Sequence, residues 1–287
     1  MKYSLYTDVK DFYRDTYDIM MRHETQNLIP LGNVIIGNAG DDKSGWRDPV
    51  NWFMATVTDG TGIRLTAIMT PPHNLTLYAT DNQIDDAAIS CLIEGIAENG
   101  VVIPGVMTEK TLAERFAQAY CAAKNLKYKV TQNQRVYELT RVNSDIPLIG
   151  SLRLSRESDM AFMPYWTEHF NYECFGTGIE KWDLKSYESC IMSKYIYILE
   201  DNGIPVSTAR LSREMRSVIG MSMVYTPPYF RNKGYASSCV AQVSQAALDR
   251  GFTKCALYTD LANPVSNSIY QKIGYVPVCD SLQIAIS

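Results

Sequence analysis

Features that define several classes of protein are missing from this 287-residue sequence. No window approaches the roughly 20 consecutive apolar residues of a membrane-spanning helix. The seven cysteines form neither a CxxC pair nor a metal-ligand pattern, and no cluster of histidines or carboxylates suggests a metal site. The first eight residues lack the apolar core of a signal peptide. We therefore expect a cytoplasmic protein with free thiols and no bound metal.

The sequence also lacks an excess of charge of one sign. Its 27 basic and 31 acidic residues are interleaved, and the net charge is −4. A surface for nucleic acid or for an anionic membrane would need a basic patch. Neither partner is therefore expected.

What the sequence does contain is an ordinary globular composition, 46% hydrophobic and 20% charged. A chain of this length is about twice the size that a single hydrophobic core supports comfortably, so two domains are expected. A polar segment at residues 143–147 marks the expected boundary. The predicted domains are residues 1–143 and 144–287.

The spacing of apolar residues predicts the same α/β plan in both halves. Pro, Gly and Asp-Gly breakers bound most of the apolar runs. In the first half we expect helices at 9–22, 85–98 and 109–124 and strands at 52–58, 63–69, 75–79, 101–106 and 136–139. In the second half we expect helices at 159–172, 183–192, 232–250 and 264–273 and strands at 152–154, 195–199, 206–211, 218–225, 255–259 and 282–286.

One strand-to-helix junction in the second half has the chemistry of an anion site. Gly234, in the first helical turn, has no side chain to obstruct a phosphate, and the unpaired amides of such a turn attract negative charge. Arg231 and Lys233 add positive charge. Pro227 and Pro228 lack an N–H group and end strand pairing where a cofactor chain could use the strand's backbone instead.

The spacing Arg231-x-x-Gly234-x-Ala236 resembles the pyrophosphate-binding signature Arg/Gln-x-x-Gly-x-Gly/Ala of the GNAT N-acetyltransferase superfamily. The alternative interpretation is a solvated helix start with a packing glycine. The resemblance is detailed over residues 195–280 and looser over the rest of the C-terminal half. It reaches the N-terminal half only through the order of elements, as in tandem-GNAT proteins.

A second family feature follows downstream in the expected order. Asn263, Tyr270 and then Gly274-Tyr275 resemble the family's Asn-x-x-Ala-x-x-x-Tyr-x-x-x-Gly-Phe stretch. Ser266 replaces the alanine and Tyr275 the phenylalanine. The alternative for Tyr270 is a half-buried aromatic residue on an amphipathic helix. The resemblance implies an α/β (α+β) fold of two GNAT-like domains, each a mixed, mostly antiparallel sheet flanked by helices.

The resemblance also implies acetyl-CoA as the co-substrate of an N-acetyltransferase. The backbone of Val224, Tyr225 and Thr226 would pair with the pantetheine arm. The pyrophosphate would be held by the segment Arg231, Asn232, Lys233, Gly234, Tyr235 and Ala236. Asn263 and Ser266 would lie on the pantetheine side, and the hydroxyl of Tyr270 would face the sulfur.

The implied chemistry is direct attack on the thioester by a primary amine of a small molecule or peptide. An unperturbed tyrosine would protonate a thiolate uphill by roughly 2 kcal/mol, so a hydrogen bond from Tyr270 to the thiolate is as reasonable as proton donation. Deprotonating an ordinary ammonium group at pH 7 costs roughly 4 to 5 kcal/mol, so a base is expected. Glu168, His169 and Asp260 are the candidates, and no spacing singles one out.

Two rival functions remain open at this point. The chain could bind acyl-CoA as a sensor or scaffold without transferring the acyl group, or each half could be catalytic. If the helix expected at 85–98 corresponds to the one that follows the anion cradle (residues 231–236), the matching lead-in is residues 81–86, with Asp81, Asp85 and Asp86 but no glycine and no cation. Three carboxylates would repel a pyrophosphate. We therefore expect a degenerate N-terminal half that shapes the acceptor site. The alternative is that the counterpart lies elsewhere in the first half.

Overall fold

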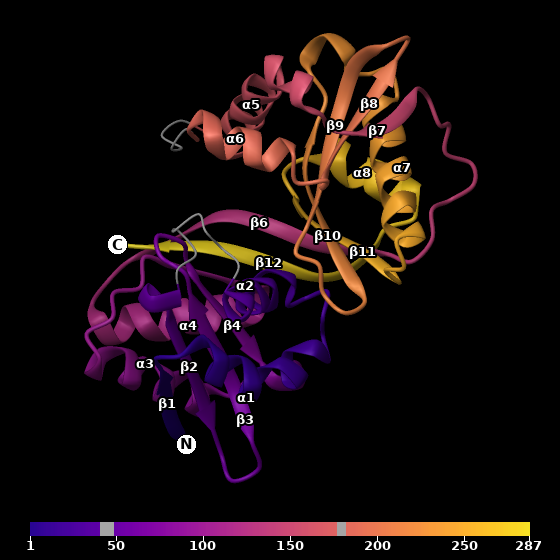
Figure 1. The fold of residues 1–287 in the computed structure, drawn as a ribbon. Helices are drawn as coiled ribbons and strands as arrows, with labels where there is room; N and C mark the ends of the chain where they lie inside the picture. Colours follow the sequence, from indigo (N-terminus) through magenta and orange to yellow (C-terminus); the bar gives the residue numbers. More distant parts are fainter. Residues whose placement is uncertain (41–48, 177–181) are drawn as a thin grey trace. The chain divides into compact units, whose positions relative to one another are not determined.

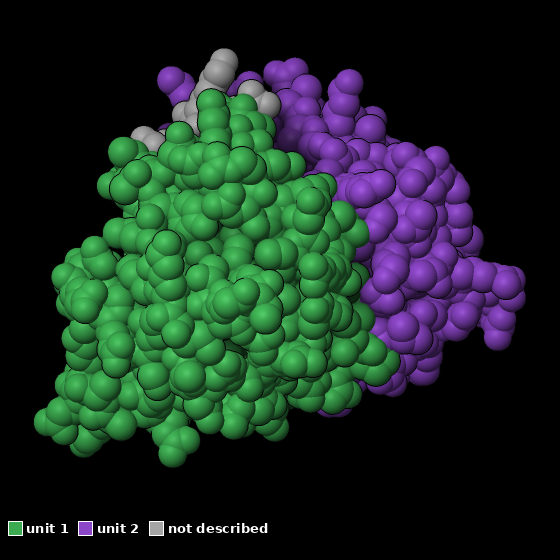
Figure 2. Space-filling model, turned by 90° about the horizontal axis from the view of Figure 1, so that it is seen from below, with its two compact units in different colours: residues 1–137, 258–262, 277–287 green, residues 138–257, 263–276 purple. Residues whose placement is uncertain are grey.

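The protein's structure, a computed structural model, describes residues 1–40, 49–176 and 182–287 (Figure 1). The chain forms two compact units, coloured separately in Figure 2. Unit 1 comprises residues 1–137, 258–262 and 277–287, and unit 2 comprises residues 138–257 and 263–276. The contiguous domains at 1–143 and 144–287 differ from these units at residues 138–143, 258–262 and 277–287, and as domains they stay a prediction.

Unit 1 holds its apolar core on both faces of its strands. Helices α3 and α4 cover the larger core, which includes Leu92, Phe116 and Ile284. Phe12 and Trp52 belong to the smaller core under α1 and α2. The elements of this unit are β1 (Lys2–Tyr6), α1 (Val9–Met21), α2 (Leu28–Ala39), β2 (Phe53–Thr58), β3 (Ile63–Met69), β4 (Leu75–Ala79), α3 (Asp86–Glu98), β5 (Gly105–Glu109), α4 (Lys110–Lys124), β6 (Tyr128–Leu139) and β12 (Val276–Ile286).

Unit 2 is built in the same way. Helix α7 packs on β9 and buries Val240 and Val243, while Met163 and Ile191 of α5 and α6 pack on Ile198 of β8. The elements of this unit are β7 (Ser151–Leu154), α5 (Met163–Phe175), α6 (Leu184–Ile191), β8 (Ile196–Asp201), β9 (Ile204–Ser212), β10 (Val218–Tyr225), α7 (Tyr235–Asp249), α8 (Pro264–Ile273) and β11 (Lys254–Asp260), whose residues 258–260 belong to unit 1.

The strands of the described residues pair in the order β1-β2-β3-β4-β5-β12-β6-β11-β10-β9-β8-β7. Most pairs are antiparallel, whereas β4 with β5 and β10 with β11 are parallel. Strand β12 lies next to β5, with Ser281 opposite Glu109 and Ala285 opposite Gly105. The expected fold class, α/β with mixed and mostly antiparallel sheets flanked by helices, is confirmed.

Each unit repeats one order of elements. Three antiparallel strands (β2-β3-β4 and β8-β9-β10) lead into a helix (α3 and α7), then into a strand parallel to the third one (β5 and β11), and then into a second helix (α4 and α8). The prediction of one plan used twice is therefore confirmed. The order also aligns α3 with α7, which makes the lead-in to α3 the counterpart of the anion cradle.

Some predicted elements were wrong. The strand at 101–106 starts only at Gly105, because Pro104 has no N–H group to donate to a ladder. Gly105 also lies where a Cβ would meet the carbonyl oxygen of Ile284 at 2.3 Å, so β12 packs close to β5 at this point. Strand β6 begins at Tyr128, eight residues before the predicted 136.

Two helices start later than predicted. The helix expected at 159 begins at Met163, after a short 3-10 turn at Glu157–Ala161, and Pro164 lies in its first turn, where proline is tolerated. The helix expected at 232 begins at Tyr235, because Gly234 has a left-handed conformation and occupies the N-cap position. Strand β1 and helix α2 were not predicted at all.

Candidate active site

Helix α7 follows a glycine in a left-handed conformation, and the first turn of the helix has no side-chain cap. Gly234 is the N-cap residue, with φ of 84° and no side-chain hydrogen bond to the helix. A left-handed conformation favours glycine because it has no Cβ. A Cβ built here would meet Cδ1 of Ile149 at 3.0 Å. The amides of the first turn therefore receive no cap from their N-cap side chain, as an anion cradle requires.

The cations of the predicted cradle already have partners within unit 2. Arg231 donates from Nε to the carbonyl oxygen of Thr226 at 2.9 Å, and its Nη2 lies 2.9 and 2.8 Å from the two carboxylate oxygens of Glu173 on α5. Nζ of Lys233 lies 4.7 Å from the centroid of the exposed Tyr229 ring. The Arg231 guanidinium is thus paired with a carboxylate, and the Lys233 ammonium is stacked on an aromatic ring.

The other three residues of the segment 231–236 are Asn232, Tyr235 and Ala236. Asn232 has φ of 61°, so it shares the left-handed turn that brings Gly234 to the helix start. Tyr235 donates its hydroxyl hydrogen to the carboxylate of Asp201. Ala236 lies in the first turn of α7. Ser238, in the next turn, donates to the carbonyl oxygen of Ile149 at 2.8 Å and ties the preceding chain to the helix.

Strand β10 stops pairing with its parallel neighbour β11 before β10 itself ends. Its pairing with β11 runs from Val218 to Gly220, and the described residues show no later pair in that register. On the β9 side the register shifts between Ser222 and Tyr225, and Met223 in between has φ of 50°. This is a β-bulge, which bends the strand. Val224 lies in the bulge, so the predicted pantetheine contacts fall where the strand is bent.

The carbonyl groups at the end of β10 already accept hydrogen bonds. Oγ of Ser207 donates to the carbonyl of Tyr225 at 3.1 Å and lies 2.8 Å from Oγ1 of Thr226. The Thr226 carbonyl accepts from Arg231. A carbonyl oxygen has two lone pairs, so each can accept a further bond from a ligand amide.

Tyr270 lies on α8 with only 8% of its surface exposed. Burial, followed by the neighbouring thiol of Cys174 on α5, raises the pKa of its hydroxyl. The raised pKa favours a hydrogen-bond donor over a proton donor, because the phenol holds its proton more tightly. Its ring packs edge-on against Tyr275, with centroids 5.8 Å apart.

The asparagine of the downstream motif caps α8. The side chain of Asn263 accepts a hydrogen bond from the backbone N–H of Ser266 at 3.1 Å. This contact explains the spacing of the two residues without a cofactor, because asparagine is a preferred N-cap residue. Their contact with the pantetheine therefore stays a prediction.

The three candidate bases differ in their surroundings. Glu168 lies on α5, and Asp260 belongs to unit 1, where its carboxylate accepts from the backbone N–H of Ala262 at 2.8 Å. His169, also on α5, has Nδ1 3.0 Å from the hydroxyl of Tyr225 and 3.7 Å from a carboxylate oxygen of Glu173. The catalytic roles of Glu168 and Asp260 stay predictions.

The contacts between helix α5 and the residues around the cradle were not predicted from the sequence. Its residues His169, Glu173 and Cys174 approach Tyr225, Arg231 and Tyr270, respectively. The signal available in the sequence was the i, i+4 spacing of His169 and Glu173, which places both on one side of a helix. Their partners lie 56 or more positions away in sequence, so the spacing alone names no contact.

In unit 1 the counterpart of the cradle is the lead-in to α3, where carboxylates of the chain already form hydrogen bonds and an ion pair. Asp85 caps α3 by accepting from the amide of Ala87 at 2.9 Å, and Asp81 pairs with Arg22 at 2.9 Å. A carboxylate thus occupies the place that an anion would need. Between β4 and β5, the hydroxyl of Thr108 donates to the carbonyl of Leu77.

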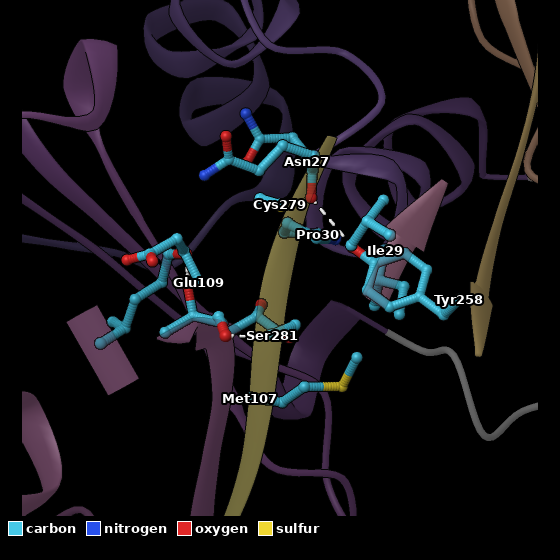
Figure 3. A pocket seen from close by; sticks show the side chains of 13 residues that line it. Asn27, Ile29, Pro30, Met107, Glu109, Tyr258, Cys279 and Ser281 are labelled. Carbon is cyan, nitrogen blue, oxygen red and sulfur yellow. Dashed lines mark hydrogen bonds between the residues drawn. The ribbon is translucent and has the colours of Figure 1, made fainter. Parts of the chain in front are cut away.

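A small cavity lies beside this parallel pair, lined by side chains that include Asn27, Met107, Tyr258 and Cys279 (Figure 3). Its volume is about 20 Å³. That is room for about one water molecule, and it is far too small for a pantetheine arm. This cavity therefore cannot hold the co-substrate.

Among the described residues no group of three or more His, Cys, Asp and Glu side chains could hold a metal ion. None of the helices in the described ranges is long and apolar enough to cross a bilayer.

Residues 155–275 match the family model described as "Acetyltransferase (GNAT) family". The C-terminal half of the chain belongs to the GNAT family. The match spans the cradle, Tyr270 and all of α5. GNAT proteins are typically N-acetyltransferases that use acyl-CoA. The family resemblance drawn from the two motifs is therefore confirmed.

Solved structures of GNAT proteins are similar to the chain over its full length. A GNAT-family acetyltransferase from Colwellia psychrerythraea is 12% identical, with a TM-score of 0.61 and complete coverage of both chains. A GNAT protein from Sphaerobacter thermophilus is 12% identical, with a TM-score of 0.59 over 99% of this chain and 95% of that one.

A tandem GNAT protein from the clavulanic acid biosynthesis pathway is 9% identical, with a TM-score of 0.57 over 100% of this chain and 98% of that one. These similarities establish a tandem-GNAT fold. The comparison with curated proteins found no match.

Proposed function

We propose that the protein is an acetyl-CoA-dependent N-acetyltransferase with one co-substrate site per chain, formed by unit 2. The observation that carries this proposal is the uncapped glycine start of α7 beside Arg231 and Lys233, inside the segment that matches the family. A helix start of this kind binds phosphate groups through its amides and its dipole.

The residues of unit 2 fit the co-substrate in three respects. The cradle has no side chain at Gly234. The bent end of β10 presents backbone groups next to a parallel strand that has already diverged. Tyr270 offers a buried hydroxyl with a raised pKa as a hydrogen-bond donor to sulfur. Bound acetyl-CoA would supply the activated acetyl group, and the acceptor would be a primary amine of a small molecule or peptide.

The activity test is release of CoA from acetyl-CoA with a broad panel of primary amines. We expect turnover with at least one amine class and none without an amine. Tight binding of acetyl-CoA with no turnover on any amine would instead identify a non-catalytic acyl-CoA sensor. No binding at all would refute both functions.

We further expect calorimetric titration of the intact chain to give one acetyl-CoA site per polypeptide. The physical reason is that Asp85 occupies the start of α3 and repels a pyrophosphate there. Two sites per chain would show that unit 1 also binds the co-substrate.

A further inference from the structure

The two units contain the same histidine–tyrosine pair. In unit 2, Nδ1 of His169 lies 3.0 Å from the hydroxyl of Tyr225, with ring centroids 5.7 Å apart and planes at 60°. In unit 1, Nδ1 of His23 lies 2.7 Å from the hydroxyl of Tyr78, with centroids 5.9 Å apart and planes at 61°. In each unit the tyrosine lies on the strand before the cradle helix or its counterpart. The pair is thus a repeated feature of the fold.

What differs is the charge around each histidine. A carboxylate oxygen of Glu173 lies 3.7 Å from Nδ1 of His169, and the same carboxylate is held by Arg231 of the cradle. In the described part of unit 1 no carboxylate lies within ion-pair distance of His23, and the neighbouring Arg22 pairs with Asp81 instead. Of these two histidines, His169 is therefore the one that the described residues link to a carboxylate and to the cradle.

We propose that His169 accepts the proton of the acceptor amine through Nε2 and that Glu173 is its positioning residue. The inference rests on the proposed function. With hydrogen on Nδ1, the ring donates to the hydroxyl oxygen of Tyr225 at 3.0 Å and faces the Glu173 carboxylate at 3.7 Å, and this tautomer leaves Nε2 as the proton acceptor. Nε2 makes no hydrogen bond among the described residues, and the side chain is 46% exposed, so an amine can reach it.

Among the described residues, the charged and titratable groups beside the imidazole, or paired with its carboxylate neighbour, come from three segments. Glu173 and the ring of Tyr172 lie on α5, Tyr225 on β10, and Arg231 on the loop before α7. Burial raises the pKa of Tyr225, so its hydroxyl stays protonated and uncharged beside the ring. The bidentate pair with Arg231 fixes the carboxylate of Glu173 in place, which is what a positioning residue needs.

The chemistry also favours an imidazole over the carboxylates Glu168 and Asp260. An ordinary histidine has a pKa of about 6.5, against about 3.9 to 4.3 for acidic residues, so it is the stronger base that is still largely unprotonated at pH 7. In the step, the amine nitrogen forms a bond to the thioester carbonyl carbon and its proton passes to Nε2. The C–S bond breaks, and its electron pair leaves with the sulfur as CoA thiolate.

The test compares kcat against pH at saturating acetyl-CoA, with the amine that wild type turns over fastest. In His169→Gln we expect kcat to fall about 10²- to 10³-fold and the acid limb of the profile to disappear, with calorimetric affinity for acetyl-CoA unchanged. Glu173→Gln should lower kcat by a smaller factor than His169→Gln and shift the pH at which the acid limb lies. His23→Gln is the matched control, because it removes the same kind of ring from the same kind of pair, and it should behave as wild type.

A wild-type profile in His169→Gln would overturn the inference. Equal losses in His169→Gln and His23→Gln would also overturn it, because the pair would then act through folding alone. Turnover in wild type is measured first. If wild type turns over no amine, the proposed function fails and this inference falls with it, whereas an active wild type with an unaffected His169→Gln refutes the inference alone.

Discussion

Gly234→Val is expected to abolish acetyl-CoA binding in calorimetry while the circular dichroism spectrum stays that of wild type. A branched side chain would project at the uncapped start of α7, where the phosphates must approach the amides. The added Cβ meets only the flexible end of Ile149, so packing can adjust. The left-handed φ of 84° adds conformational strain of roughly 1–2 kcal/mol.

The matched control for this strain is Gly251→Val. Gly251 lies just after the other end of α7, has φ of 100°, and has nothing within 4 Å of a built Cβ. The variant therefore carries a similar backbone strain on the same helix but cannot block the cradle, and its acetyl-CoA affinity should match wild type. Retained affinity in Gly234→Val, or equal losses in both variants, would contradict the assignment of the cradle.

Tyr270→Phe is expected to lower kcat about 10²-fold or more while acetyl-CoA affinity survives, because only the hydroxyl that faces the departing sulfur is removed. The raised pKa of Tyr270 also predicts how kcat depends on pH. The phenol stays protonated above its ordinary pKa of about 10, so raising the pH to 10 should not remove its contribution to kcat. Steady-state kinetics over this range checks both points.

Tyr275→Phe is the control for the hydroxyl deletion. Tyr275 is a buried neighbour whose hydroxyl lies 2.8 Å from Oγ of Ser244. Losing that hydrogen bond should cost about 1 kcal/mol of unfolding free energy and leave turnover intact. Full activity in Tyr270→Phe, or the same loss of kcat in both variants, would refute the role of Tyr270.

Elements bounded by strong breakers were predictable from the sequence. The predicted strands 63–69 and 218–225 and the helix 264–273 have the bounds seen in the structure, because Gly62, Pro227 and Gly274 fix their ends. Helix α2 was not predictable in this way. It contains Pro30, Gly32 and Gly37, which disfavour a helix locally.

Tertiary packing accounts for α2. A Cβ on Gly37 would meet the ring of Trp52 at 2.7 Å, so the glycine is what lets the helix lie against the core. Contacts between distant segments also decide which parts of the candidate site could be predicted from the sequence. The cradle is local in sequence and could be predicted from one motif. The contacts of Arg231 with Glu173 and of Tyr225 with His169 join segments 58 and 56 positions apart, and no periodicity encodes them.

The position of β12 has a consequence for the order in which the protein can be made. Residues 277–287 belong to unit 1, where β12 lies between β5 and β6, yet they are translated after nearly all of unit 2. Domains commonly fold from the N-terminus as the chain emerges from the ribosome. Here the half that emerges first must wait with the edges of β5 and β6 unpaired. Unit 1 can therefore complete its strand pairing only after nearly all of unit 2 has been synthesised.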